Sequence, residues 1–252
     1  MLNKLKTRQL IPCSFTIAAL IAGLFSILKS ASGEYVVAAQ FIMLSMILDG
    51  MDGTLARMLK GTSRFGAELD TFVDITSFGT APAVLLYMAV LKDFGFWGIV
   101  LVSFYLSSGA VRLSRFRIVD PKRGQSGFMG LPITACAGWT ALFVFVIFSG
   151  KFDEQMFSLR HGPVAAFFWV ATVIMLFLQV SRVHYAKPTK ELVMFIPSIF
   201  FVGFLFLHAS VAIAAAIAMI GYGIVYVFIS PMLPKHIEVA DEDEEEPLTV
   251  EN

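Results

Sequence analysis

Charged residues are scarce in this chain: they make up 15% of its 252 residues, whereas 57% are hydrophobic. A soluble domain of this length carries more charge, because its surface faces water. Cysteine is also rare, with only Cys13 and Cys136, and both lie inside apolar runs. Two such cysteines exclude a disulfide framework and a cysteine-rich zinc site. The composition therefore indicates a chain whose solvent is lipid.

Long hydrophobic runs are what the chain has in abundance. A helix needs about 20 apolar residues to cross the hydrocarbon core of a bilayer. The sequence predicts eight such helices, over residues 11–28, 35–59, 67–91, 94–115, 131–148, 164–180, 191–207 and 210–229. We expect the first to be a permanent helix, because no small-residue cleavage pattern clearly ends it. The predicted fold is all-α, a polytopic transmembrane helix bundle.

The basic residues are unevenly distributed along the chain. All but four of the 19 Lys and Arg residues fall on one side of the predicted spans, the exceptions being Lys29, Lys92, Lys151 and Arg160. The positive-inside rule then predicts that both termini are cytoplasmic. An unbroken run of acids at residues 241–246 cannot bury apolar area. We therefore predict a transmembrane catalytic domain at 1–230 and a disordered, acidic cytosolic tail at 231–252.

Four aspartates stand where lipid should exclude them. Asp49 and Asp52 are expected at the cytoplasmic end of the second predicted helix, and Asp70 and Asp74 in the first turns of the third. A charge inside a membrane segment is costly and marks function by default. Residues three and four apart share a helix face, and a short loop makes the two helices antiparallel neighbours. The four carboxylates are therefore expected to converge.

Converging carboxylates repel one another unless they take up protons or bind cations. All-oxygen ligands favour Mg²⁺ or Mn²⁺ over zinc, and a pair of such ions is a recurrent device for displacement at phosphorus. Gly53, Ala56 and Gly66 share the acidic faces and would let a ligand approach the backbone, while Arg57 can pair with a phosphate. The pattern predicts a phosphate ester held by metals against two helices.

These residues match the signature D-x2-D-G-x2-A-R-x8-G-x3-D-x3-D without departure, and on them the chain resembles the CDP-alcohol phosphotransferase family. The resemblance covers the first six predicted helices, so it implies a six-helix catalytic core with two C-terminal helices added. It implies that the four aspartates hold two divalent cations, Mg²⁺ or Mn²⁺. It also implies that Asp74 is the catalytic base for the acceptor hydroxyl. The residues implied to line the CDP pocket are Gly53, Ala56, Arg57 and Gly66.

Two further stretches bear on the acceptor alcohol. Residues 111–116 (VRLSRF) and 127–132 (GFMGLP) resemble the membrane-type phosphatidylserine synthase branch of the family in bacteria and archaea. This implies phosphatidyl transfer from CDP-diacylglycerol to L-serine, at the cytoplasmic face of a prokaryotic inner membrane. A homodimer is expected within the membrane lipid, and no nucleic-acid partner. Arg112 and Arg115 are candidates for binding the serine carboxylate or a phosphate, although both also fit ordinary positive-inside residues.

Other readings stay open on the sequence. Glycerol phosphate, inositol phosphate or choline as the acceptor would use the same chemistry. A divalent metal transporter is a more distant alternative, because intramembrane acids also mark ion pathways. Transporter sites lie near the bilayer midplane, however, whereas these acids are expected near one membrane face.

Overall fold

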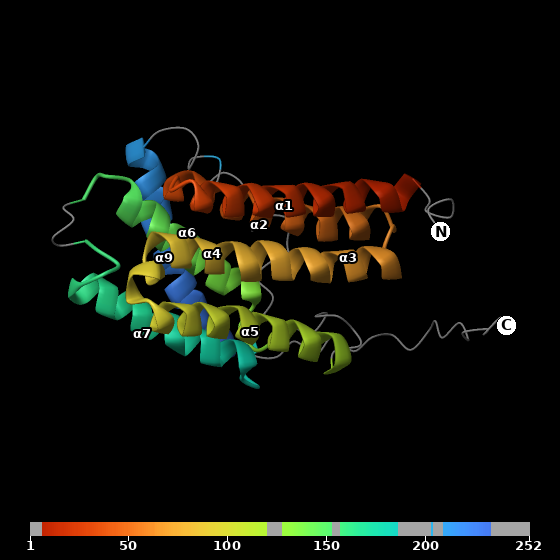
Figure 1. The fold of residues 1–252 in the computed structure, drawn as a ribbon. Helices are drawn as coiled ribbons and strands as arrows, with labels where there is room; N and C mark the ends of the chain where they lie inside the picture. The colour runs from red at the N-terminus through yellow and green to blue at the C-terminus, as the bar shows by residue number, and fades with distance from the viewer. Residues whose placement is uncertain (1–6, 120–127, 153–156, 186–202, 204–208, 233–252) are drawn as a thin grey trace.

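The computed structural model describes residues 7–119, 128–152, 157–185, 203 and 209–232. Within them, six helices are long and apolar enough to cross a membrane. Figure 1 shows α1, α3 and α5 with roughly parallel axes, α5 running in the direction opposite to the other two. The α-helices are α1 (Thr7–Ala31), α2 (Tyr35–Met58), α3 (Arg64–Asp74), α4 (Ala81–Ala89), α5 (Phe96–Val119), α6 (Ile133–Phe148), α7 (Gly162–Val180) and α9 (Ala209–Ile229). The short elements are η2 (Ile75–Thr80), η3 (Leu91–Phe94), η4 (Ser230–Met232), β1 (Phe128–Met129) and β2 (His184–Tyr185).

The third crossing is a composite of three elements. α3, the π-helical turn η2 and α4 follow one another without a break and together form one membrane-length helix. The hydroxyl of Thr80 donates to the carbonyl of Ile75 within η2. The hydroxyl of Ser77 donates to the carbonyl of Ala19 on α1. Since π-turns occur often at functional sites, the position of η2 directly after Asp74 is notable.

α6 is the central helix of the bundle. Most of its side chains are buried, and it packs against α2, α4 and α9. The outer helices instead expose large apolar side chains, including Phe96 and Trp97 on α5 and Phe228 on α9. Helices that are apolar on all sides are either buried or surrounded by lipid. The bundle therefore has a packed protein core and a lipid-compatible exterior.

The helical prediction is confirmed, with differences of detail. Within the described residues, the β1–β2 ladder is the only sheet, and it pairs Phe128 with Tyr185 and Met129 with His184. α6 has 16 residues and begins directly after Pro132, so it is shorter than the roughly 20 residues that a crossing needs. The predicted span 191–207 lies outside the described residues apart from Gly203. Of the predicted tail, residues 233–252 likewise lie outside them.

A close backbone contact connects the start of α6 to the end of α7. Gly130 has a φ of 78°, which favours glycine, and its N–H donates to the carbonyl of Val183 at 2.8 Å. The N–H of Leu131 donates to the carbonyl of Leu178 at 3.0 Å. A Cβ at Gly130 would overlap the carbonyl oxygen of Gln179. The glycine therefore allows a backbone approach that holds the two helices together.

Candidate metal and phosphate site

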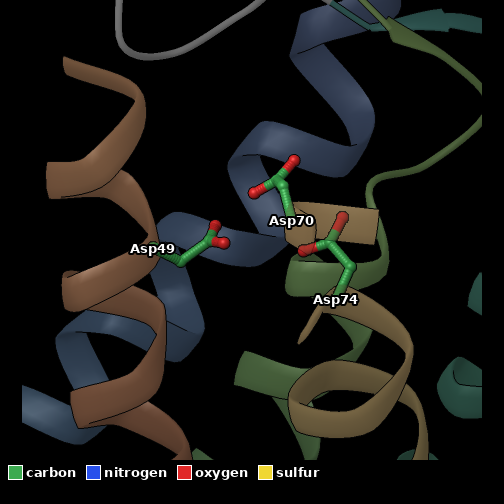
Figure 2. A group of neighbouring side chains, drawn as sticks. All are labelled: Asp49, Asp70 and Asp74. Carbon is green, nitrogen blue, oxygen red and sulfur yellow. The ribbon is translucent and has the colours of Figure 1, made fainter. Parts of the chain in front are cut away.

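Three of the four predicted aspartates meet between α2 and α3. Carboxylate oxygens of Asp49, Asp70 and Asp74 all lie within 4.8 Å of one another. Figure 2 shows Asp49 reaching from α2 toward the other two side chains on α3. Two like unit charges at such a separation repel by about 3 kcal/mol at an effective dielectric constant of about 20. A cluster of this kind needs protons or cations to be stable.

The turn between α2 and α3 sets the depth of the cluster. Ser63 caps α3, its hydroxyl accepting the N–H of Gly66 at 3.0 Å, so α3 begins at Arg64 and not near residue 67 as the hydropathy suggested. Asp74 consequently lies about 15 Å from the start of α3, at about 1.5 Å per residue. Asp70 and Asp74 therefore lie about three residues further along α3 than the predicted start at residue 67 implied. On α2, which ends at Met58, Asp49 and Asp52 lie at the expected depth.

Asp52 lies beside the cluster, facing α1. Its side chain is 5% exposed and is close to Thr16 and Cys13 of α1. Its charge still acts on Asp49 and Asp74. One carboxylate oxygen of Asp49 and one of Asp52 are buried without a hydrogen-bond partner. Buried oxygens of this kind are costly unless a ligand satisfies them.

The donor set fits a divalent cation that prefers oxygen. Among the His, Cys, Asp and Glu side chains of the described residues, those of Asp49, Asp70 and Asp74 are close enough to share an ion. All their donor atoms are carboxylate oxygens, which Mg²⁺ and Mn²⁺ accept and which zinc uses less often. The unsatisfied oxygens of Asp49 and Asp52 provide further ligand capacity. The residues present therefore fit a bound metal.

The small residues of the signature differ in their surroundings. A Cβ at Gly53 would meet only Arg57, whose Nη1 would be 3.9 Å away. Arg57 is exposed, and its guanidinium donates to the hydroxyl of Thr54 at 3.3 Å. Beside Gly66, in contrast, a Cβ would lie 3.1 Å from the Ser63 hydroxyl and 3.6 Å from the Cys13 sulfur. Gly53 therefore has open space for a ligand, whereas the space beside Gly66 is filled by protein.

Ala56 contributes to the turn that follows α2. Its carbonyl accepts the N–H of Gly61 at 2.9 Å. A Cβ at Gly61 would overlap the carbonyl of Arg8 at the start of α1. This contact fixes the turn against α1 and with it the relative depth of α2 and α3.

The two candidate arginines of α5 have different environments. Arg112 is 5% exposed and close enough to Asp74 for their charges to attract. The guanidinium of Arg115 donates to the carbonyl of Val180 at 2.6 Å and to that of Ser181. Since a helix leaves its last carbonyls unsatisfied, Arg115 caps the end of α7. Only Arg112 of this pair lies at the acid cluster.

Sequence reasoning did not anticipate Arg117 and Glu68. Arg117 of α5 forms an ion pair with Glu68 of α3 and donates to the carbonyl of Ala67 at 3.2 Å. These contacts hold α5 against the acid-bearing part of α3. The signal was weak, because Arg117 looked like one more positive-inside residue, and only packing shows its partner.

Comparison with known proteins identifies the family. The family model for CDP-alcohol phosphatidyltransferase matches residues 9–181. This chain belongs to the CDP-alcohol phosphatidyltransferase family. The family region contains all eight signature residues and both candidate arginines, Arg112 and Arg115, whereas α9 lies beyond it. Together with the apolar helices, family membership makes the chain an integral membrane enzyme.

Several relatives of this chain are named CDP-diacylglycerol–serine O-phosphatidyltransferase. The chain is 30% identical to the one from Helicobacter pylori, over 86% of its own length and 90% of the relative's. It is 40% identical to the one from Bacillus subtilis, over 49% of its own length and 68% of the relative's. It is 39% identical to the one from Methanocaldococcus jannaschii, over 48% of its own length and 54% of the relative's.

Proposed function

We propose that this chain transfers the phosphatidyl group of CDP-diacylglycerol to the hydroxyl of L-serine, giving phosphatidylserine and CMP. The observation that carries the proposal is the convergence of Asp49, Asp70 and Asp74 within 4.8 Å, in a chain of this family. The serine acceptor is supported by the name of the Helicobacter pylori relative, which the chain matches along most of its length. The VRLSRF and GFMGLP stretches agree with that choice.

The metal site is proposed to hold two divalent cations, Mg²⁺ or Mn²⁺. Its ligands would come from Asp49, Asp52, Asp70 and Asp74. The unsatisfied buried oxygens of Asp49 and Asp52 support their inclusion. When bound, the cations neutralise the acids and stabilise charge that develops on the phosphate and on the leaving group.

Asp74 is proposed to be the catalytic base. Its carboxylate takes the proton from the serine hydroxyl while the serine oxygen forms a bond to the phosphorus that bears the lipid. The bond between that phosphorus and the CMP oxygen breaks, and CMP leaves with its electron pair. Proton transfer by a positioned carboxylate contributes typically about 10²–10⁴-fold to rate. The attraction of nearby Arg112 helps to hold the Asp74 carboxylate at the site.

The CDP group is proposed to lie against the acid-bearing end of α2. Gly53 leaves room for it, and the exposed guanidinium of Arg57 is available to a phosphate. Ala56 and Gly66 complete the proposed pocket. Gly66 contributes by letting α3 pack against Cys13, so its effect on CDP is indirect.

The site is proposed to open to the cytoplasm of a prokaryotic cell, in the inner membrane. The basic residues near the α2–α3 turn, Arg57, Lys60 and Arg64, support this orientation. Both termini would then be cytoplasmic, as the positive-inside rule predicts. A homodimer remains an expectation that the family resemblance implies.

An acceptor screen tests the function. Purified protein is incubated with CDP-diacylglycerol, Mn²⁺ and one radiolabelled alcohol at a time: L-serine, glycerol phosphate, inositol phosphate or choline. We expect label in lipid with serine alone, and release of one CMP per lipid formed. Incorporation of another alcohol, but not of serine, would make that alcohol the acceptor and leave the proposed chemistry unchanged. Metal flux into proteoliposomes without CDP-lipid, and no transfer, would instead favour a transporter.

A further inference from the structure

Two serine hydroxyls, one from α2 and one from η2, donate to the same carbonyl oxygen of α1. Ser45 donates to the carbonyl of Ala19 at 2.9 Å, and Ser77 donates to the same oxygen at 3.2 Å. All three residues are fully buried. The two bonds therefore link three separate helical segments at one buried point, which we call the Ala19 junction.

The Ala19 junction lies next to the acid cluster on both of the helices that carry acids. Ser45 precedes Asp49 by four residues, and Ser77 follows Asp74 by three. Each hydroxyl is thus within about 6 Å of its aspartate along the helix axis, at about 1.5 Å per residue. Because the short turn reverses the chain between α2 and α3, both serines lie on the side of the acids that faces away from that turn. The acids are therefore held between the turn and the junction.

The side chains where α1 meets α2 and η2 are small. Ala19 and Ala22 of α1 are both buried there, beside the two serines. Small residues let membrane helices approach closely, but they interlock less than large side chains do. A hydrogen bond is directional, so the two hydroxyls fix the rotation and the height of their helices more firmly than these small contacts can.

The π-helical turn η2 gives Ser77 its direction. It spans Ile75–Thr80 and begins directly after Asp74. A π-turn holds more residues than an α-turn, so it rotates the side chains that follow Asp74 away from their α-helical positions. Such turns are frequent at functional sites. In this protein, the turn lets Asp74 stay in the acid cluster while Ser77 is buried against α1.

We propose that Ser45 and Ser77 are positioning residues for the metal site, because they set the separation of Asp49 and Asp74 by tethering both helices to one oxygen of α1. The two bonds act in series, so the loss of either hydroxyl frees that separation. This inference rests on the proposed function, since it assumes that the aspartates bind divalent cations. Mg²⁺ demands nearly ideal octahedral geometry, so a relaxed separation lowers its affinity.

Ser45→Ala and Ser77→Ala test the positioning role. Tyr35→Phe is the matched control, because it removes a hydroxyl that donates to the carbonyl of Met88 at 2.8 Å. It therefore also breaks a hydrogen bond between α2 and the third crossing, but about 21 Å along α2 from Asp49. Binding of Mn²⁺ to substrate-free, monodisperse protein in detergent is measured by electron paramagnetic resonance, well below the lowest Tm. Tm is measured separately, without metal.

The serine variants and the control should differ in metal affinity and agree in stability. We expect the Kd for Mn²⁺ to rise about five-fold in each serine variant and to change less than about two-fold in Tyr35→Phe, from the usual strength of hydrogen bonds between membrane helices. Tm should fall in all three variants, because each loses one hydrogen bond between helices.

Two further readouts separate positioning from general loosening of the bundle. Competition with Mn²⁺ gives the Kd of Mg²⁺ and of Ca²⁺, and the ratio of the first to the second should rise several-fold in both serine variants, because Ca²⁺ accepts flexible geometry and Mg²⁺ does not. The double variant Ser45→Ala/Ser77→Ala should bind Mn²⁺ about as weakly as the more affected single variant, since bonds in series are lost together.

The outcomes separate this inference from the proposed function. If the wild type binds no Mn²⁺, the proposed metal site fails and the positioning role fails with it. If the wild type binds Mn²⁺ and both serine variants bind it equally well, only the positioning role is overturned. An equal loss of affinity in Tyr35→Phe, or losses that multiply in the double variant, would mean that the hydroxyls do not set a shared separation and would also overturn it.

Discussion

The buried guanidinium of Arg112 on α5 lies close enough to the carboxylate of Asp74 on α3 for the two charges to attract. This pairing links the acid cluster to a helix that comes much later in the chain. It gives the site two electrostatic regions, one suited to cations and one suited to an anionic group.

Asp74→Asn should lower kcat at least about 100-fold, because it removes the proposed base. Binding of CDP-diacylglycerol should persist in part, since the other aspartates remain. Turnover and equilibrium binding of the lipid are measured on the same preparation. Asp93→Asn is the control, because Asp93 is an exposed acid paired with Arg160 away from the cluster. Near wild-type turnover in Asp74→Asn would refute the base assignment.

Asp49→Asn should weaken metal binding. We expect the Mn²⁺ concentration for half-maximal rate to rise by at least about ten-fold, because a charged oxygen ligand becomes a neutral amide. Removal of metal with a chelator should abolish turnover in the wild type, and added Mn²⁺ or Mg²⁺ should restore it. Rates that do not depend on metal in the wild type would contradict the metal site.

Gly53→Ala should impair CDP-diacylglycerol binding without harming the fold. The added methyl group enters space that the protein leaves open, and alanine is favoured over glycine within a helix. We expect KM for the lipid to rise several-fold while Tm stays the same or increases. An unchanged lipid KM would mean that no ligand approaches this face of α2.

Gly23→Ala is the packing counterpart of that variant. A Cβ at Gly23 would overlap the hydroxyl of Ser77, where α1 crosses η2. Overpacking of this kind costs about 1–3 kcal/mol, so Tm in detergent should fall. The lipid KM of the protein that stays folded should match the wild type, and a selective KM change would argue against a packing role.

Substitutions of Arg112 and of Arg115 should have different effects. Arg115→Ala removes two hydrogen bonds to the last carbonyls of α7, so it should destabilise the fold by about 1–3 kcal/mol. Arg112→Gln should instead raise KM for serine and lower Tm less than Arg115→Ala does. Thermal melts and serine titrations of both variants check this, and the reverse pattern would exchange the two assignments.

The acid cluster shows how far sequence reasoning reached. The three- and four-residue spacings and the short turn between α2 and α3 predicted that four aspartates would meet; Asp49, Asp70 and Asp74 do, while Asp52 lies beside them. The depth of Asp70 and Asp74 along α3 was misjudged, because hydropathy does not detect the Ser63 cap that starts α3 early. Hydropathy also could not separate α6, which is buried in protein, from helices that face lipid.

The sequence by itself determined that the chain is a membrane protein, that it is helical, and that two successive helices carry the acids. These properties are local, since they depend on apolar content and on spacing within one or two helices. Only the tertiary structure decided that Arg112 is buried near Asp74 while Arg115 binds the end of α7, and that Gly66 packs on Cys13. Those relations join helices far apart in the chain, and the rotation of each helix in the packed bundle sets them.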